Sequence, residues 1–595
     1  MVGMPHDCLA NPLGAVRLTF EKAVASGYDP AVLQGKDWGT AELFRQFLFD
    51  DDCLSQVPML SPSTLKWVQP NTLVRFRGMI QDMLGNEFYV GAYKDGDTWR
   101  TNKFADSSHS PINTSLDMQI WERRLLYCIP VPGQNFWVES LEEAVKNTHT
   151  NLISPKREKR PREDEAILGD VDMMESDATE GSPNSKKMRE DGLSSEPLTT
   201  MPQTVTGGTF SNVSSVPDTE INYFSCRIKI YDTAESEMKL NDIFEFVGVL
   251  TFDPEFPVDS VDCDGFTQSI CEDELVHLPS SKVSWIHCII HRKLAVNDFL
   301  SGPALELMPN TAKDLREALV GHLTTVLGND WVAAQYMLLH LLSRVHARVD
   351  SVAVGKLSLN LTCLGKDSMS VFGRNLKFAI ECLLPFTRTL PITINYLNTI
   401  SLTPKKDYNT NRLVFGFLQL TEGSHLTIDE TQLQAGTLDS TGVDNARVLK
   451  NLMESQTVEY DFTYYKMEMP VDVQLLILSE GKSHILPADL VLPFRPSSVE
   501  APLTVDEETL KAWRWYLGMM KCLSHSIDPD VQKVVEDDLV AARRADRSLG
   551  SLDFSRLLTM GRLMSISFGE SHLSKEHWQM VKELETIRKE RLQEI

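Results

Sequence analysis

Leu426-Thr427-Ile428-Asp429-Glu430 is an apolar stretch that ends in two adjacent carboxylates. ATPases present the carboxylates that hold Mg²⁺ and polarise water in this way, at the end of a buried strand. In such enzymes a Walker A loop precedes the acidic strand, because its backbone N–H groups cradle the phosphates while its Lys and hydroxyl reach phosphate and metal. This sequence has no Walker A loop. The stretch therefore predicts an ATPase-like body without ATPase chemistry.

All four Gly-Lys pairs of the chain depart from the Walker A pattern, which is Gly, four residues and Gly-Lys-Ser/Thr. Three pairs lack the final Ser or Thr, and the positions of their first glycine hold Pro30, Asp350 and Asn360. Gly481-Lys482-Ser483 has the right ending, but Leu476 occupies the first glycine position and the motif follows the acidic strand. We therefore expect Asp429 and Glu430 to be solvated or to cap the next helix rather than to bind a metal.

The sequence around this stretch alternates between apolar strands and helical stripes. Strand candidates are 357–364, 392–394, 426–428 and 473–478, and helical stripes run through 315–327, 334–345, 371–383 and 445–453. This alternation implies a mostly parallel sheet that is covered on both faces. We predict a degenerate AAA+-like α/β domain at 301–500, without a phosphate loop, followed by a helical lid-like domain at 501–595.

The N-terminal half has a different pattern. Helical spacing over 9–60 predicts a helical N-terminal cap at 1–60. Short β-branched and aromatic runs at 73–80, 88–93 and 124–129 predict an OB-like β module at 61–149, and runs at 224–231, 243–250 and 283–294 predict a second part at 221–300. Residues 150–220 are rich in Ser, Thr, Pro and acidic residues and predict a disordered linker, which either interrupts one β module or separates two. The predicted fold class is therefore α/β plus β.

Bulk composition limits the function classes. The 595-residue chain is 42% hydrophobic and carries a net charge of −25, which argues against binding nucleic acid over a broad surface. Its ten cysteines form no Cys-x-x-Cys pair, so we expect reduced thiols in cytosol or nucleus. No apolar run approaches the length of a membrane span, and we expect no membrane partner.

Two side-chain groups suggest binding chemistry, but the sequence favours a plainer role for each. Histidines and cysteines between 263 and 291 crowd one region without the spacing of a common zinc site, so we expect structural or surface roles for Cys263, Cys271, His277, His287, Cys288 and His291. On a strand, His287 and Cys288 would point to opposite faces. Arg75 and Arg77 would share one face of a barrel strand, as in barrels that hold single-stranded nucleic acid, but the net charge favours a solvated strand face. We expect no metal and no cofactor.

The linker holds the candidates for regulation. A basic cluster there is a nuclear-import candidate that an importin would read, and it consists of Lys156, Arg157, Lys159, Arg160 and Arg162. A solvated charge run is the alternative reading. A weaker cluster is Lys186-Lys187-Met188-Arg189. Ser154-Pro155 precedes the first cluster in the form that proline-directed kinases select, so phosphate on Ser154 would lower the positive charge of the import signal.

Several stretches of the chain resemble the mini-chromosome maintenance complex-binding protein family. They are 405–420 (KKDYNTNRLVFGFLQL), Ile428-Asp429-Glu430-Thr431, Gly436-Thr437-Leu438-Asp439, Tyr460-Asp461-Phe462, Asn11-Pro12-Leu13-Gly14 and 76–83 (FRGMIQDM). The resemblance implies a nuclear protein that binds the hexameric mini-chromosome maintenance helicase, promotes its release from replicated chromatin and supports sister-chromatid cohesion. It also implies kinship with the helicase subunits, whose nucleotide-binding loop is missing here.

The leading hypothesis is a non-enzymatic regulator whose ATPase-like body competes for contacts between helicase subunits, with an indirect association with chromatin. A chaperone or assembly factor for free subunits is a second reading, a divergent ATPase is a third, and a single-strand DNA-binding adaptor is a fourth. No nucleophile elbow, His-Glu-x-x-His pair or dinucleotide fingerprint is present, so the sequence offers no catalytic residues.

Overall fold

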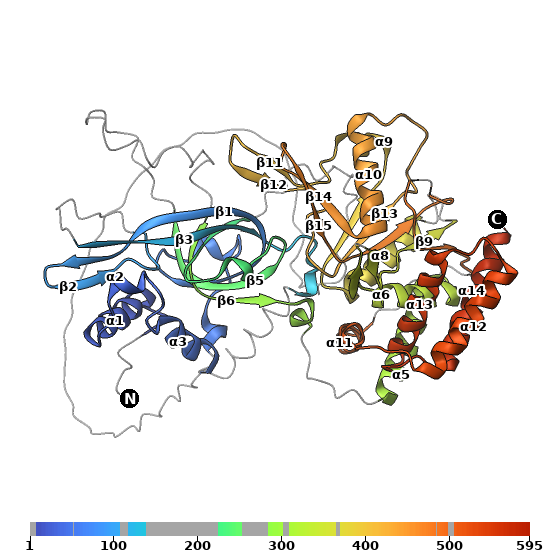
Figure 1. The fold of residues 1–595 in the computed structure, drawn as a ribbon, viewed down its shortest axis with the longest axis horizontal. Coiled ribbons are helices and arrows are strands. Elements are labelled where there is room, and N and C mark those ends of the chain that lie inside the picture. Colours follow the sequence, from blue (N-terminus) through green and yellow to red (C-terminus); the bar gives the residue numbers. More distant parts are fainter. Residues whose placement is uncertain are drawn as a thin grey trace, which may run out of the picture. The chain divides into compact units, whose positions relative to one another are not determined.

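The computed structural model describes residues 7–50, 53–106, 117–138, 224–252, 284–300, 309–350, 352–363, 369–483, 485–497 and 505–594. It mixes helices with several sheets, and it has an N-terminal group of strands and a C-terminal group of helices, as the sequence predicts (Figure 1). Within these ranges, no helix combines the length and the apolar character that crossing a bilayer requires.

Short helices open the chain. They are α1 (Pro12–Ala25), α2 (Pro30–Leu33) and α3 (Thr40–Arg45), followed by the π-helical turn η1 (Gln46–Asp50) and the 3-10 turns η2 (Cys53–Gln56) and η3 (Thr64–Lys66). The side chain of Asn11 caps α1 by accepting a hydrogen bond from Gly14 N, and Pro12 begins the helix with a preset φ. Val16 and Phe44 are buried in one cluster with Val249 of the strands, so these helices pack against the β module.

Six strands form the N-terminal sheet, in the order β2-β1-β3-β4-β6-β5, and an additional β1–β5 pairing closes five of them into a barrel. Their bounds are β1 (Leu73–Asp95), β2 (Thr98–Thr101), β3 (Met118–Ile129), β4 (Cys226–Ile230), β5 (Ile243–Phe252) and β6 (Ser284–Leu294). The β4–β6 pair is parallel and the other pairs are antiparallel. Strands from both sides of 150–220 therefore share one sheet.

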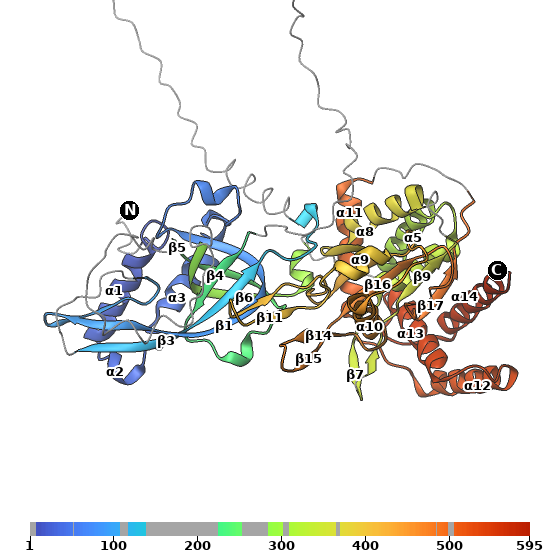
Figure 2. The same cartoon turned by 90° about the horizontal axis from the view of Figure 1, so that it is seen from above.

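One sequence prediction in this region is wrong. The runs at 73–80 and 88–93 are not separate strands but parts of the single strand β1. Gly85, with φ of 94°, looks like a turn residue in the sequence, yet it lies at one of three register shifts in the β1–β3 pairing. Such irregularities bend a strand without ending it. As a result, β1 first pairs with β5 in the barrel and then continues with β3 beyond it (Figures 1 and 2).

The central part of the chain forms a five-stranded parallel sheet in the order β10-β13-β16-β9-β17. The strands are β9 (Leu359–Thr362), β10 (Thr387–Pro391), β13 (Ser424–Asp429), β16 (Val473–Leu478) and β17 (Leu490–Pro493). The surrounding helices are α5 (Pro309–Val326), α6 (Trp331–Leu342), α8 (Arg374–Leu383), which follows the π-helical η6 (Met369–Gly373), α9 (Ile394–Thr399) and α10 (Ser440–Ser455). The predicted parallel α/β sheet is confirmed.

Side chains of β16 alternate between two cores. Leu476 and Leu478 lie in one cluster with α5, α6 and α8, whereas Leu475 and Ile477 lie in another with α9 and α10. Successive side chains of a strand point to opposite faces, so an unbroken apolar run means burial on both sides.

Four helices end the chain: α11 (Glu507–Cys522), α12 (Pro529–Ala545), α13 (Ser551–Ser567) and α14 (Lys575–Gln593). The side chain of Ser574 caps α14 by accepting from His577 N at 3.1 Å. Trp513, Met560 and Val581 belong to the same core as Leu359 of β9. The C-terminal helices therefore pack directly on the parallel sheet.

Other boundaries differ from the sequence prediction. The strand expected at 392–394 is β10, which ends at Pro391, because Thr393 caps α9 through its side chain. The helical stripe that we extended to Val345 ends at Leu342. The periodicity also missed a small sheet of β11 (Lys405–Asp407), β12 (Arg412–Val414), β14 (Thr457–Asp461) and β15 (Lys466–Pro470), and the hairpin of β7 (Ala347–Val349) and β8 (Val352–Val354). These strands have only three to five residues each, too few to show a clear period in the sequence.

Candidate functional site

The structure places Asp429 and Glu430 at the carboxyl edge of the parallel sheet, directly at the end of β13. Asp429 Oδ1 accepts hydrogen bonds from Thr431 N at 2.9 Å and Thr431 Oγ1 at 2.6 Å. Glu430 is buried, and its Oε1 accepts from Ser483 Oγ at 2.8 Å, while the same hydroxyl accepts from Leu486 N at 2.9 Å. We had expected both carboxylates to be solvated or to cap the next helix, but Asp439 caps that helix, Glu430 is buried and Asp429 is partly buried. Instead, their hydrogen bonds stabilise the two loops at this edge of the sheet that contain Thr431 and Ser483.

The neighbouring strand ends are joined in the same way. Ser479 Oγ is 2.8 Å from Asn360 Oδ1 and 2.6 Å from Gly481 O, and Cys363 N donates to Glu480 O at 3.0 Å. Asn360 is the residue that stands where a Walker A loop would have its first glycine. Its buried amide thus contacts the end of β16. Across the described ranges, no group of three or more His, Cys, Asp or Glu side chains is arranged to hold a metal ion.

Exposed aromatic side chains cluster at the two turns of the small sheet, between β11 and β12 and between β14 and β15. Tyr408, Tyr464 and Tyr465 are 48%, 83% and 58% exposed. The Tyr408 and Tyr464 rings meet edge to face at 5.3 Å, and Phe462 stacks on Tyr465 at 5.0 Å. We call these four side chains the aromatic tip. Exposed clusters of tyrosine are typical of protein interfaces, because the rings supply contact area at low entropic cost.

The turn that presents the aromatic tip has an unusual backbone. Thr463 has φ of 64°, which is rare for a β-branched residue. Tyr464 N donates to Phe462 O at 2.6 Å, so these three residues form a γ-turn with a left-handed centre, a strained form. Thr463 N donates to Asp461 Oδ1 at 2.7 Å, and Phe462 N donates to Tyr465 O at 3.0 Å. Such strain is concentrated at functional sites, and here it exposes Tyr464.

The small sheet is also tied to the barrel. Gln81 Nε2 donates to Leu413 O at 2.7 Å, Gln419 Nε2 donates to Gln81 O at 2.9 Å, and Leu413 N donates to Asp82 Oδ2 at 2.7 Å. All four residues are buried. These hydrogen bonds join the two longest stretches that carry the family resemblance, 76–83 and 405–420. The small sheet that carries the aromatic tip is therefore joined to strand β1 of the barrel by buried hydrogen bonds.

Arg75 and Arg77 share one face of β1, as predicted, but that face is not solvated. Their side chains are only 12% and 18% exposed, and both guanidinium groups approach the carboxylate of Glu245, at 3.7 Å and 3.2 Å. Arg292 Nη2 donates to the other oxygen of Glu245 at 3.0 Å. The prediction of a solvated face is wrong because a buried carboxylate on the paired strand β5 attracts both cations.

His287 and Cys288 do point to opposite faces. Cys288 lies in the barrel core, whereas His287 is 2.6 Å from Tyr231 Oη through Nδ1 and 3.0 Å from Asp106 Oδ2 through Nε2. Burial lowers the pKa of His287 to about 4, although Asp106 opposes the shift. His291, also in β6, is half-buried, and its ring lies 5.9 Å from that of Phe244. The remaining candidates of this region, Cys263, Cys271 and His277, lie outside the described residues.

Asp106 is the centre of a polar cluster that the sequence did not reveal. It accepts hydrogen bonds from Lys229 Nζ at 2.6 Å and Arg123 Nη2 at 3.0 Å, and it also contacts His287. Burial alone would raise the pKa of Asp106, but the hydrogen bond and charge of His287 and the two cations hold it well below its usual range. The residues come from β3, β4, β6 and a loop, and no local motif connects them.

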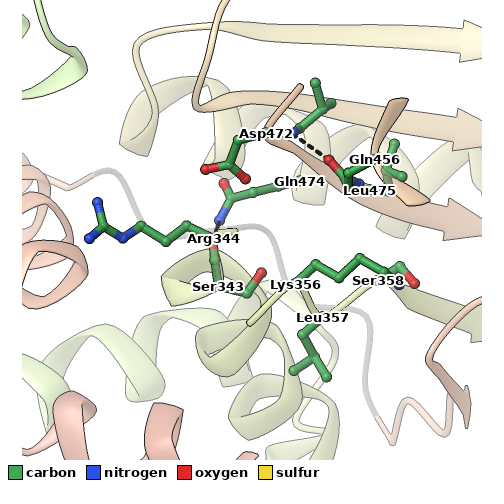
Figure 3. A pocket seen from close by; sticks show the side chains of 10 residues that line it. Ser343, Arg344, Lys356, Leu357, Ser358, Gln456, Asp472, Gln474 and Leu475 are labelled. Atoms are coloured by element: carbon green, nitrogen blue, oxygen red, sulfur yellow. Dashed lines mark hydrogen bonds between the residues drawn. The ribbon is translucent and has the colours of Figure 1, made fainter. Parts of the chain in front are cut away.

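A small cavity of about 10 Å³ lies at the opposite, amino edge of the parallel sheet (Figure 3). Gln474 lines it, and its Nε2 donates to the carbonyl oxygens of His340, Leu341 and Ser343 at 2.8–3.0 Å. Lys356 Nζ pairs with Asp489 at 2.7 Å on another wall. The cavity has room for about one water molecule, which rules it out as a site for a larger ligand.

The regulatory candidates of the sequence lie outside the described residues. These are Ser154, the import cluster Lys156, Arg157, Lys159, Arg160 and Arg162, and the weaker cluster at 186–189.

Comparison with known proteins agrees with the resemblance. The model of the mini-chromosome maintenance replisome factor family matches residues 44–592. A relative in Arabidopsis thaliana, named mini-chromosome maintenance complex-binding protein, is 56% identical over 597 residues and the alignment covers 100% of both chains. Relatives of the same name in Mus musculus and Homo sapiens are 33% and 32% identical, over 99% of this chain and 98% of each relative. The chain therefore belongs to the mini-chromosome maintenance replisome factor family.

Proposed function

We propose that this chain is a non-enzymatic, nuclear regulator of DNA replication that binds the mini-chromosome maintenance helicase complex. In this role it promotes release of the helicase from chromatin and supports sister-chromatid cohesion. The observation that carries the proposal is the full-length match to relatives whose name states that they bind this complex. Binding that favours the separated helicase would shift its assembly equilibrium without hydrolysis.

The two folds that we assign to the chain agree with such a role. The closed barrel, with its parallel β4–β6 pair, supports an OB-like module. For the central domain, the unit β9–α8 has the strand-loop-helix order in which a phosphate loop would lie, and Asp429 follows a strand of the same parallel sheet. This arrangement supports a degenerate AAA+-like body. A body related to the helicase subunits could present a subunit-like face to them.

The absence of enzymatic activity is part of the proposal. It rests on the missing Walker A loop and on the hydrogen bonds that occupy Asp429, Glu430 and Ser483. ATP turnover that is lost on Glu430→Gln would contradict it.

The proposal is tested by affinity purification of the tagged chain from synchronised nuclear extract, with and without ATP. We expect helicase subunits to be recovered equally in both conditions. Recovery of free subunits away from chromatin, and never of chromatin-derived complexes, would favour the assembly-factor reading instead. If no helicase subunit is recovered, the proposal fails.

We assign the contact with the helicase to the aromatic tip. Changing Tyr464 and Tyr465 together to Ser is expected to weaken helicase binding by at least tenfold, because buried interface tyrosines often contribute about 2 kcal/mol each. The thermal unfolding of the variant should match the wild type, since both rings are exposed. Phe88→Ser is the matched control, because it removes an exposed aromatic ring of β1. Equal binding by the double variant and the wild type would exclude the aromatic tip.

Nuclear entry is the last part of the proposal. We expect a fluorescent fusion to become cytoplasmic when Lys156, Arg157, Lys159, Arg160 and Arg162 are all changed to Ala. Ser154→Asp should reduce import, because the added negative charge lies beside the basic cluster, while Ser154→Ala should not. Unchanged import in both Ser154 variants would remove the phosphorylation hypothesis.

A further inference from the structure

A cavity of about 530 Å³ lies in the C-terminal half of the chain, away from the carboxyl edge and the aromatic tip. Its walls are the segment before β7, the end of β8, the segment that follows α11, and one face of α13. This volume is within the range of pockets that hold small organic ligands.

Apart from the thiol of Cys522, the titratable side chains of the cavity wall are all basic. They are Arg344, His346, His525 and Arg562, and no Asp or Glu is among the described residues that line the cavity. The chain as a whole has a net charge of −25, so a cavity wall with basic residues and no acidic ones differs from the average composition of the protein.

Three nitrogen atoms of these side chains are buried and have no hydrogen-bond partner in the described part of the chain: Arg344 Nε, Arg562 Nη1 and His525 Nε2. A buried N–H donor without a partner costs free energy, so the two guanidinium nitrogens call for an acceptor, whereas His525 Nε2 donates or accepts according to its tautomer. All three belong to the cavity wall.

The cations of the cavity also oppose one another. Burial lowers the pKa of Arg562, and the charge of Arg344 lowers it further. Burial lowers the pKa of His525 to about 4, with contributions from Arg562 and nearby histidines. The acidic residue that interacts electrostatically with Arg344 is Asp472, which directly precedes β16. Its Oδ1 accepts a hydrogen bond from Val345 N at 3.0 Å. Figure 3 shows the guanidinium of Arg344 pointing away from that carboxylate.

The walls are held in place before any ligand arrives. Gly355 has φ of 98°, and a Cβ there would be 2.0 Å from His346 Nδ1, so the glycine makes room for this imidazole. Ser526 forms a parallel bridge with His572, which fixes the segment after α11. Ser555, Thr559 and Arg562 follow one another at helical spacing on one face of α13.

We propose that this cavity binds an organic phosphate. Arg344 and Arg562 would pair with the phosphoryl group, because guanidinium groups suit phosphate geometry, and the hydroxyls of Ser555 and Thr559 would donate to its oxygens. The organic part of the ligand would contact the apolar side chains of the wall, which are Val354, Leu523, Ile527 and Leu558. Bare phosphate would leave most of a 530 Å³ cavity unfilled.

Isothermal titration calorimetry on the full chain, at constant ionic strength in chloride, tests the proposal with three probes: inorganic phosphate, phosphoserine and AMP. We expect saturable binding of phosphoserine or AMP, tighter than that of phosphate. The two organic probes distinguish a phosphorylated side chain from a nucleotide as the source of the phosphoryl group. Binding of phosphate alone, or of no probe, would overturn the proposal.

Arg344→Gln and Arg562→Gln are expected to weaken binding of the organic probe at least tenfold. Arg543→Gln is the matched control, because it removes an exposed arginine of the nearby helix α12. In phosphate-free buffer, Arg562→Gln should leave the melting temperature unchanged or raise it, since one of two like charges is removed. A structural arginine would instead lower the melting temperature when replaced. Undiminished binding by both variants would refute the site.

Discussion

Replacing Asp106 with alanine is expected to lower the free energy of unfolding by about 3–5 kcal/mol, because it leaves buried cations without their carboxylate. Lys229 loses most, since its hydrogen bonds to the two carboxylate oxygens of Asp106, at 2.6 Å and 2.8 Å, would both disappear. Arg123 keeps a second partner, Glu87, at 3.1 Å. His287 loses the acceptor of its Nε2–H.

A double-mutant cycle separates this charge effect from a general loss of packing. Lys229→Met removes the buried ammonium and keeps an unbranched side chain, so Asp106→Ala should cost less in the Lys229→Met background by about 1–3 kcal/mol. Urea titrations followed by tryptophan fluorescence measure all four proteins. Asp95→Ala is the control, because it breaks the exposed Asp95–Arg100 pair, which contributes at most about 1 kcal/mol. If Asp106→Ala lowered the free energy of unfolding no more than Asp95→Ala, the cluster around Asp106 would not stabilise the fold.

Acid is expected to destabilise the protein steeply between pH 7 and pH 5. Burial lowers the pKa of His340 from 6.5 to about 4, and it lowers the pKa of His425 well below 6.5, with the charge of His340 contributing. Below pH 6.5 the unfolded chain therefore binds more protons than the folded chain, and stability is lost progressively as the pH falls toward the folded pKa. Each such histidine is expected to cost about 2 kcal/mol between pH 7 and pH 5.

The geometry of the two histidines explains why both stay neutral. His340 Nδ1 is 2.8 Å from Leu357 O, so this nitrogen carries the proton and donates. His340 Nε2 must then accept, and the nitrogen 3.1 Å away that donates to it is His425 Nε2. A second proton on His340 would sit on Nε2 and place two donors against each other in a core between α6 and β13. A second proton on His425 would sit on Nδ1, which is buried and has no hydrogen-bond partner in the described part of the chain.

His425→Gln tests this account, because an amide can donate to His340 Nε2 and does not titrate. Urea titrations at pH 7 and pH 5 measure the loss of stability on acidification. We expect the variant to lose about 2 kcal/mol less than the wild type. An identical pH dependence in the two proteins would show that His425 does not contribute to the acid sensitivity.

Sequence reasoning was most accurate where a pattern is local. The run 473–478 is apolar except for Gln474, which favours a strand buried on both faces, and β16 has these bounds. Helix starts could be read in the same way, because Ser574 caps α14 within its own first turn. The absence of a Walker A loop can also be read from the sequence, because this motif is one short, continuous stretch. At β1 the same reasoning failed, because glycine is common both in turns and in β-bulges, and the sequence does not show which of the two Gly85 forms.

The sequence by itself thus determined the parallel α/β sheet, the presence of a β module, the helical C-terminus and the family. Only the tertiary structure decided which polar side chains meet: Gln81 with Gln419 over 338 positions, and Asp106 with His287 over 181. It also decided that Arg75 and Arg77 share Glu245 and that four basic side chains line one cavity. The physical reason is that burial of apolar area follows a short period along the chain, whereas the partner of a charge depends on elements that are distant in sequence.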